Sequence, residues 1–173
     1  MSRLRRIDAV RTEFAEAAER HLDDVHAFLV YLTGDRAVAE ELTAETFARA
    51  CERWHRFDPR RGSARTWLCQ LARSTALDHF RSEDRRRRRE GRYAVGLAEV
   101  AEPVFGEGLS PALEAALSRL SAAEREVLAL RIVLELDGES AARALGISAT
   151  ACSTRLSRAL QKLEREVSAG VAA

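Results

Sequence analysis

The side chains most suited to chemistry lie on one face of a helix predicted near the C-terminus. Apolar residues recur there at steps of three and four, which predicts a helix with one buried stripe. This stripe consists of Cys152, Leu156, Ala159, Leu160, Leu163 and Val167. The opposite face has no acid before Glu164 and carries Thr150, Ser153, Thr154, Ser157, Arg158 and Gln161. Hydroxyls contact phosphates or base edges and arginine binds guanine bidentately. This face therefore suits duplex DNA, the alternative being a purely structural helical corner.

A strongly cationic block occupies the middle of the chain. The whole chain has 28 basic and 27 acidic side chains, a net charge of +1, but residues 53–92 hold 13 basic and 5 acidic groups. Within this block, residues 85–89 are five successive arginines. Such a run either lies in solvent at a helix end or binds phosphates, where each neutralised phosphate adds salt-dependent affinity through counterion release.

The loop at the start of this block combines aromatic rings with arginines. Phe57, Arg60 and Arg61 lie between Trp54 and Trp67. Aromatic faces beside cations suit unstacked, single-stranded bases. The alternative is that each tryptophan belongs to the hydrophobic core.

Catalytic, metal-binding and cofactor-binding motifs are absent from the sequence. The four histidines show no paired ligand spacing, and no glycine-rich phosphate loop is present. The adjacent side chains of Asp78 and His79 diverge by about 100° on a helix, so they form no oriented dyad. Cys51, Cys69 and Cys152 share no CxxC spacing. We expect no enzyme activity, no metal, no cofactor, and reduced cysteines that fill apolar space, with a redox-sensing thiol as the alternative.

The composition favours an all-α fold. Apolar residues make up 46% of the chain, which has only three prolines and nine glycines. Apolar periodicity predicts helices over residues 8–32, 35–54 and 64–90, separated at Gly34 and by a loop with Pro59 and Gly62. The expected buried stripes include Val10 and Leu22 in the first helix and Cys51 in the second.

A second helical unit follows residues 93–110, which hold three glycines, one proline and no basic group and therefore suggest a flexible linker. Ser121 and Glu124 form the sequence pattern of a capping box at a helix start. A short helix over residues 139–145 ends at Gly146, and Ser148 caps the last helix. Two helices joined by so tight a turn predict a helix-turn-helix.

Membrane insertion is not expected. No apolar run approaches the roughly 20 residues that span a bilayer. The first residues hold no hydrophobic stretch followed by a small-residue cleavage site. We therefore expect a cytoplasmic protein.

Two sets of motifs resemble regions 2 and 4 of bacterial RNA polymerase sigma factors. Those similar to region 2 are residues 32–42 (LTGDRAVAEEL), 45–47 (ETF), 67–68 (WL), 71–73 (LAR) and 76–81 (ALDHFR). Those similar to region 4 are residues 116–120 (ALSRL), 125–128 (REVL), 145–148 (LGIS) and 155–159 (RLSRA). Only a short linker separates them, so the chain resembles the two-domain, extracytoplasmic-function (ECF) type. The resemblance implies an all-α fold with region 2 over residues 8–92, a linker over 93–110 and region 4 over 111–168.

The resemblance also implies partners and site residues. The second helix would dock on the clamp helices of the largest subunit of core RNA polymerase, whose flap is a further contact, through Glu41, Leu42, Glu45, Phe47 and Arg49. The following loop and helix would bind the non-template strand of the −10 element and hold a flipped base. Their residues are Phe57, Arg60, Arg61, Ser63, Arg65, Trp67, Arg73, Ser74 and Arg81. The last helix would read the −35 major groove of promoter DNA through Thr150, Ser153, Thr154, Arg155, Ser157 and Arg158.

Some positions depart from the family. Ala44 stands where glutamine is usual, Ser74 replaces a common asparagine, and residues 151–153 replace threonine, valine and a basic residue. ECF relatives are typically held inactive by an anti-sigma factor, which implies a further partner. The alternative function is a stand-alone helix-turn-helix regulator that binds duplex DNA without polymerase.

Overall fold

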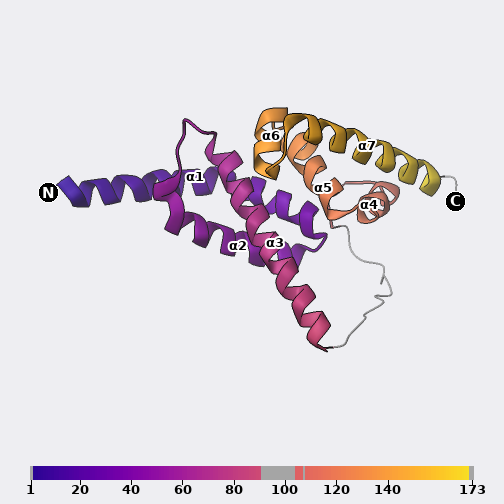
Figure 1. Cartoon of the computed structure of the whole chain (residues 1–173), viewed down its shortest axis with the longest axis horizontal. Coiled ribbons are helices and arrows are strands. Elements are labelled where there is room, and N and C mark those ends of the chain that lie inside the picture. Colours follow the sequence, from indigo (N-terminus) through magenta and orange to yellow (C-terminus); the bar gives the residue numbers. More distant parts are fainter. Residues whose placement is uncertain (1, 91–103, 107, 172–173) are drawn as a thin grey trace.

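The computed structural model describes residues 2–90, 104–106 and 108–171, and within these ranges every regular element is helical, as predicted (Figure 1). None of the described helices is apolar over a length that would cross a bilayer. The elements are α1 (Ser2–Thr33), α2 (Arg36–Arg53), the 3-10 turn η1 (Trp54–Arg56), α3 (Ala64–Glu90), α4 (Pro111–Ser118), α5 (Ala122–Leu128), the π-helical turn η2 (Ala129–Val133), α6 (Gly138–Leu145) and α7 (Ala149–Val171).

Short polar residues begin several helices, as their sequence positions predict. The Asp35 carboxylate accepts a hydrogen bond from the Val38 N–H at 3.1 Å. Ser121 and Glu124 form the complete capping box, in which each side chain accepts from the other residue's backbone N–H. Gly146 ends α6 with a φ of 66°, a left-handed conformation that glycine adopts without strain.

The N-terminal module consists of α1, α2, η1 and α3, which pack against one another. Helix α2 contributes mainly small side chains, namely Ala39, Leu42, Thr43, Thr46 and Ala50. The hydroxyls of Thr43 and Thr46 donate to carbonyls one turn earlier, so both are buried with their donors satisfied. Because these small residues define the buried face, Cys51 lies outside it and is exposed. The predicted burial of Cys51 is wrong.

Helix α1 is longer than predicted and only partly covered. It begins at Ser2 and projects beyond α2 and α3 at its N-terminal end (Figure 1). Val25, Phe28 and Leu29 are fully buried. In contrast, Val10 is 37% exposed and Leu22 48% exposed, because no other helix covers them. Their predicted burial is therefore wrong.

The C-terminal module consists of α4, α5, η2, α6 and α7. Val127, Leu130 and Leu134 form part of its core, as predicted. Helices α6 and α7 pack together, joined by a turn at Gly146, and form the predicted helix-turn-helix. Leu160 was expected in the buried stripe of α7 but is 41% exposed.

The two modules share one hydrophobic core. Helix α1 packs on α5 and η2, α3 packs on α6, and the buried residues form a single cluster. Arg125 of α5 donates to Tyr31 O at 2.7 Å and to Leu32 O at 3.3 Å, which satisfies two carbonyls at the end of α1. The modules are therefore in direct contact.

The described end of the predicted linker is also packed. Phe105 is buried and lies 5.3 Å from the Tyr31 ring, centroid to centroid. Its N–H donates to Glu114 at 2.8 Å, and Val104 O accepts from Arg36 Nε at 3.1 Å. The expectation of a flexible linker over all of residues 93–110 is thus wrong for this end, because an aromatic ring and a carboxylate fix it. Residues 93–103 and 107 lie outside the described residues.

Candidate nucleic-acid interface

The outward face of α7 is exposed to solvent, as its sequence pattern predicts. Its exposed side chains are Thr150, Ser153, Thr154, Ser157, Arg158 and Gln161. Cys152 and Ala159 face the core on the opposite side. Arg155 differs from the other predicted −35 residues, because its guanidinium pairs with Glu126 at 3.2 Å. The remaining hydroxyls and Arg158 form a face without an acid before Glu164.

The predicted single-strand site is built on a cluster of aromatic rings. Trp54 and Phe57 stack with centroids 4.8 Å apart, and Trp67 lies 5.7 Å from each of them. Trp54 is buried and belongs to the core, as the alternative interpretation predicted. Phe57 and Trp67 are half-buried and keep part of their surface accessible. The cluster fixes the position of the loop that follows η1.

A cavity of about 250 Å³ opens beside this cluster. Its walls include Phe57, Arg61, Ser63 and Trp67 from the N-terminal module and Arg143 from α6. Ser63 also caps α3, since its hydroxyl accepts from the Thr66 N–H at 3.1 Å. Aromatic carbon, a hydroxyl and a guanidinium around one cavity supply both stacking and hydrogen bonds for a base.

The arginines along α3 have different partners. Arg65 makes a two-pronged ion pair with Asp24 of α1, at 2.7 and 3.0 Å. This pair holds α3 on α1, and the DNA contact of Arg65 stays a prediction. Arg81 and Arg60 are exposed, as is Ser74. The arginines at 85–89 are also exposed, and within the described residues Arg86 pairs with Glu83 and Arg88 with Asp84, each one turn away on α3.

Arg73 is bound by an acid that the sequence analysis missed. Its Nε donates to Glu126 Oε2 at 2.9 Å, and the Glu126 side chain is only 3% exposed. The other oxygen of Glu126 accepts from Arg155. One feature of the sequence indicated that Glu126 is buried. Glu126 falls on the apolar stripe of its helix, one turn before Leu130 and two turns before Leu134.

The predicted polymerase-docking residues lie along α2. Glu41 and Glu45 are exposed, and Arg49 pairs with Glu45 at 2.6 Å and with Asp78 at 3.2 Å. Leu42 is 2% exposed, so it cannot contact a partner and instead belongs to the core. This corrects its predicted role.

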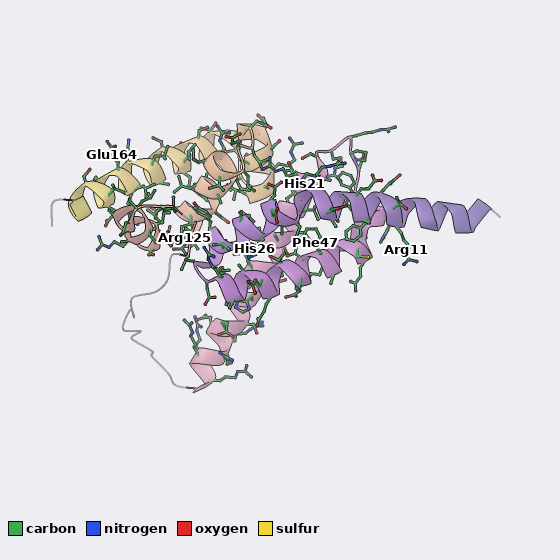
Figure 2. The ribbon with its side chains drawn as sticks, turned by 180° about the vertical axis from the view of Figure 1, so that it is seen from behind. Arg11, His21, His26, Phe47, Arg125 and Glu164 are labelled. Atoms are coloured by element: carbon green, nitrogen blue, oxygen red, sulfur yellow. The ribbon has the colours of Figure 1, made fainter. Side chains whose placement is uncertain are left out.

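A groove of about 540 Å³ between α1 and α2 extends this surface. Phe47 and His26, labelled in Figure 2, line it from α2 and α1. Phe14 and Leu22 also line it, and Glu19, Asp23 and Glu40 add negative charge. The sequence analysis missed this groove because it placed Leu22 in the core.

The three cysteines differ in burial and in their surroundings. No cluster of three or more His, Cys, Asp or Glu residues suited to a metal occurs in the described part of the chain. Cys69 and Cys152 are buried, as expected, and burial raises the pKa of Cys69 to about 12 and also raises that of Cys152. Both thiols are therefore protonated near neutral pH.

Sequence comparisons identify both modules. A family model of Sigma-70 region 2 matches residues 17–86, and one of Sigma-70 region 4 matches residues 110–163. The chain is 34% identical over 142 residues to the ECF RNA polymerase sigma factor SigC of Mycobacterium tuberculosis, covering 81% of this chain and 75% of SigC. Identity is 32% to BldN of Streptomyces coelicolor and 29% to SigM of Bacillus subtilis, both ECF RNA polymerase sigma factors. The matches cover 88% and 90% of this chain, 59% of BldN and 96% of SigM.

Solved structures share the fold. The sigma factor RpoE in complex with the anti-sigma factor NepR, from Bartonella quintana, matches with a TM-score of 0.78 at 23% identity over 90% of this chain and 97% of that one. CnrH in complex with the cytosolic domain of CnrY matches with a TM-score of 0.66 at 22% identity over 92% and 90%. At such identities the likeness establishes the fold alone.

Proposed function

Because the chain belongs to the ECF family of bacterial RNA polymerase sigma factors, we propose that it binds core RNA polymerase and directs initiation at particular promoters. It then acts as a transcription initiation factor in the cytoplasm and not as a stand-alone regulator. The observation that supports this proposal is that one chain combines two different faces whose residues suit nucleic acid. One is a helix-turn-helix suited to duplex DNA, and the other is an aromatic and cationic cavity suited to an unstacked base.

Helix α7 is assigned to the −35 element. Thr154, Ser157 and Arg158 occupy neighbouring turns of its exposed face. Arginine reads guanine through two hydrogen bonds in the major groove, and hydroxyls contact phosphates or either base type. Arg158 is thus the main candidate for sequence discrimination.

The cavity beside Trp67 is assigned to the −10 element. Extruding a base costs a few kcal/mol of stacking and pairing energy, which the receiving pocket must offset. Phe57 and Trp67 offer ring surface and Arg61 a cation at this cavity. The exposed arginines at 85–89 extend the positive charge along α3 for the phosphate backbone.

The surface of α2 is assigned to the clamp helices of polymerase. Glu41 and Glu45 present negative charge, and the neighbouring groove presents Phe47 and Leu22. A helical partner with apolar side chains flanked by basic ones would complement this surface. The polymerase flap remains a proposed contact of the C-terminal module. An anti-sigma partner is proposed because the similar RpoE and CnrH structures contain NepR and CnrY.

Transcription with core polymerase tests the proposal. Adding the protein should produce initiation at specific promoters of its genome, whereas core alone should not. Glu41→Arg should weaken association with core and reduce transcription. The matched charge reversal Glu164→Arg, on exposed α7, should leave core association unchanged. Specific DNA binding without any association with core would instead support a stand-alone regulator.

A further inference from the structure

Two cavities lie next to each other where α3 faces α6. The first is the cavity of about 250 Å³ beside Trp67, and the second has a volume of about 340 Å³. Gln70 and Arg143 line both cavities, and Gln70 Nε2 donates to Arg143 O at 2.7 Å. Together the cavities offer a volume within the range of about 300–1,000 Å³ that small-molecule sites occupy.

The first cavity is surrounded by positive charge that carboxylates do not neutralise. Arg56, Arg61 and Arg143 line it, and Asp58 is the one acid among its described lining residues. Within the described part of the chain, none of these arginines forms an ion pair with a carboxylate. Arg143 Nη1 donates to Arg61 O at 2.7 Å, which leaves other N–H groups of its guanidinium for a ligand.

The second cavity is also basic. Arg73, Arg81 and Arg143 line it, and its described lining residues include no acid. Arg73 is paired with Glu126 at 2.9 Å. Arg81 is paired with Asp78 at 3.4 Å. Neither carboxylate lines the cavity, so the guanidinium groups that do line it make it suitable for phosphate oxygens, which arginine binds with a forked geometry.

The first cavity adds ring surface to this charge. Phe57 and Trp67 are half-buried, with ring centroids 5.7 Å apart. Trp54 stacks on Phe57 at 4.8 Å and fixes its position. Nucleobases of any type stack on such rings. One end of the paired cavities therefore suits a base and the other end suits phosphates.

We propose that the two cavities together form a binding site for a free nucleoside polyphosphate. The base stacks beside Phe57 and Trp67, and the phosphates extend past Gln70 toward the arginines of the second cavity. A DNA strand carries one charge per nucleotide, whereas a nucleoside triphosphate concentrates several charges beyond a single base and so matches this cluster of arginines. The proposal goes beyond the proposed function, which assigns a base of the DNA strand to the first cavity and no ligand to the second.

Calorimetric titration of the full-length chain with ATP measures this binding directly. ATP should bind saturably, and AMP should bind at least about tenfold more weakly because its single phosphate makes fewer charge-assisted hydrogen bonds. Inorganic tripolyphosphate should bind at least about fivefold more weakly than ATP, because it has no base to stack. ATP should also quench tryptophan fluorescence, since Trp67 lines the first cavity.

Variants test each end of the site. Arg143→Ala should weaken ATP binding at least about tenfold, because Arg143 lines both cavities. Arg165→Ala removes an exposed arginine of α7 that lines neither cavity, and this matched control should leave ATP binding unchanged. Phe57→Leu should weaken ATP binding at least about fivefold without changing tripolyphosphate binding. It also serves as the second variant if circular dichroism shows that Arg143→Ala fails to fold.

The outcomes separate this proposal from the proposed function. Absence of saturable ATP binding would overturn the nucleotide site. Equal effects of Arg143→Ala and Arg165→Ala would also overturn it, because they would indicate general attraction to a basic protein. Tripolyphosphate that binds as tightly as ATP would overturn the role of the rings. Transcription with core polymerase is measured separately, so promoter-specific initiation together with absent ATP binding would reject the nucleotide site alone.

Discussion

The ion pair between Asp24 and Arg65 is predicted to anchor the start of α3 on α1. The nitrogen–oxygen distances are 2.7 and 3.0 Å, and the side chains are 26% and 28% exposed. Removing one partner of a fully buried pair costs about 3–5 kcal/mol, whereas an exposed pair contributes about 0–1 kcal/mol. For a pair that is about three-quarters buried, we expect Asp24→Asn to lower the free energy of unfolding by about 2 kcal/mol. At about 2–4 °C per kcal/mol, the melting temperature should fall by about 4–8 °C.

Urea unfolding followed by tryptophan fluorescence measures this change, because Trp54 and Trp67 lie in the same module. The control is Asp84→Asn, which breaks an exposed pair with Arg88 and should cost less than about 0.5 kcal/mol. The double variant with Arg65→Gln should lose less stability than the sum of the single variants. Equal effects of Asp24→Asn and Asp84→Asn would refute the structural role of Arg65.

Further predictions concern DNA binding, thiol reactivity and pH. Arg158→Ala should cost about 1–3 kcal/mol at a cognate −35 duplex and relax its specificity, whereas equal weakening on all duplexes would indicate a phosphate contact. Replacing the arginines at 85–89 with glutamine should flatten the salt dependence of DNA binding, and an unchanged slope would leave them as solvated charges. Cys51 should react with a thiol reagent in the native protein, while Cys69 and Cys152 should react only after unfolding. Rapid labelling of all three thiols in the native protein would contradict the burial of Cys69 and Cys152. Burial raises the pKa of Glu124, but hydrogen bonds from Ser121 and from the Lys162 ammonium outweigh burial and lower this pKa below its ordinary value of 4.5. Its stabilising effect should be present above pH 4.5 and be lost as the pH falls through the lower folded pKa, so Glu124→Gln should destabilise more at pH 7 than at pH 3.

The capped helix starts and the exposed face of α7 could be predicted because they depend on neighbours in sequence. A cap such as Asp35 or Ser121 bonds an N–H three residues away. Likewise, the helical period alone places Ser157 about 200° around the helix from the buried Ala159. Resemblance to the family supplied candidate roles for these residues. The geometry of each candidate site depends in addition on which other helix packs against the one that carries these residues.

The buried face of α2 could not be predicted from apolarity. Alanine and threonine permit close helix packing, but their weak hydrophobic signal is outweighed by that of Cys51, which proves exposed. The position of Phe105 could not be predicted from the sequence either. Its contacts are with Tyr31 of α1 and Glu114 of α4, and the sequence does not show that these two helices meet there. Leu22 was misassigned for the opposite reason, since an apolar residue on a periodic stripe can also face an open groove.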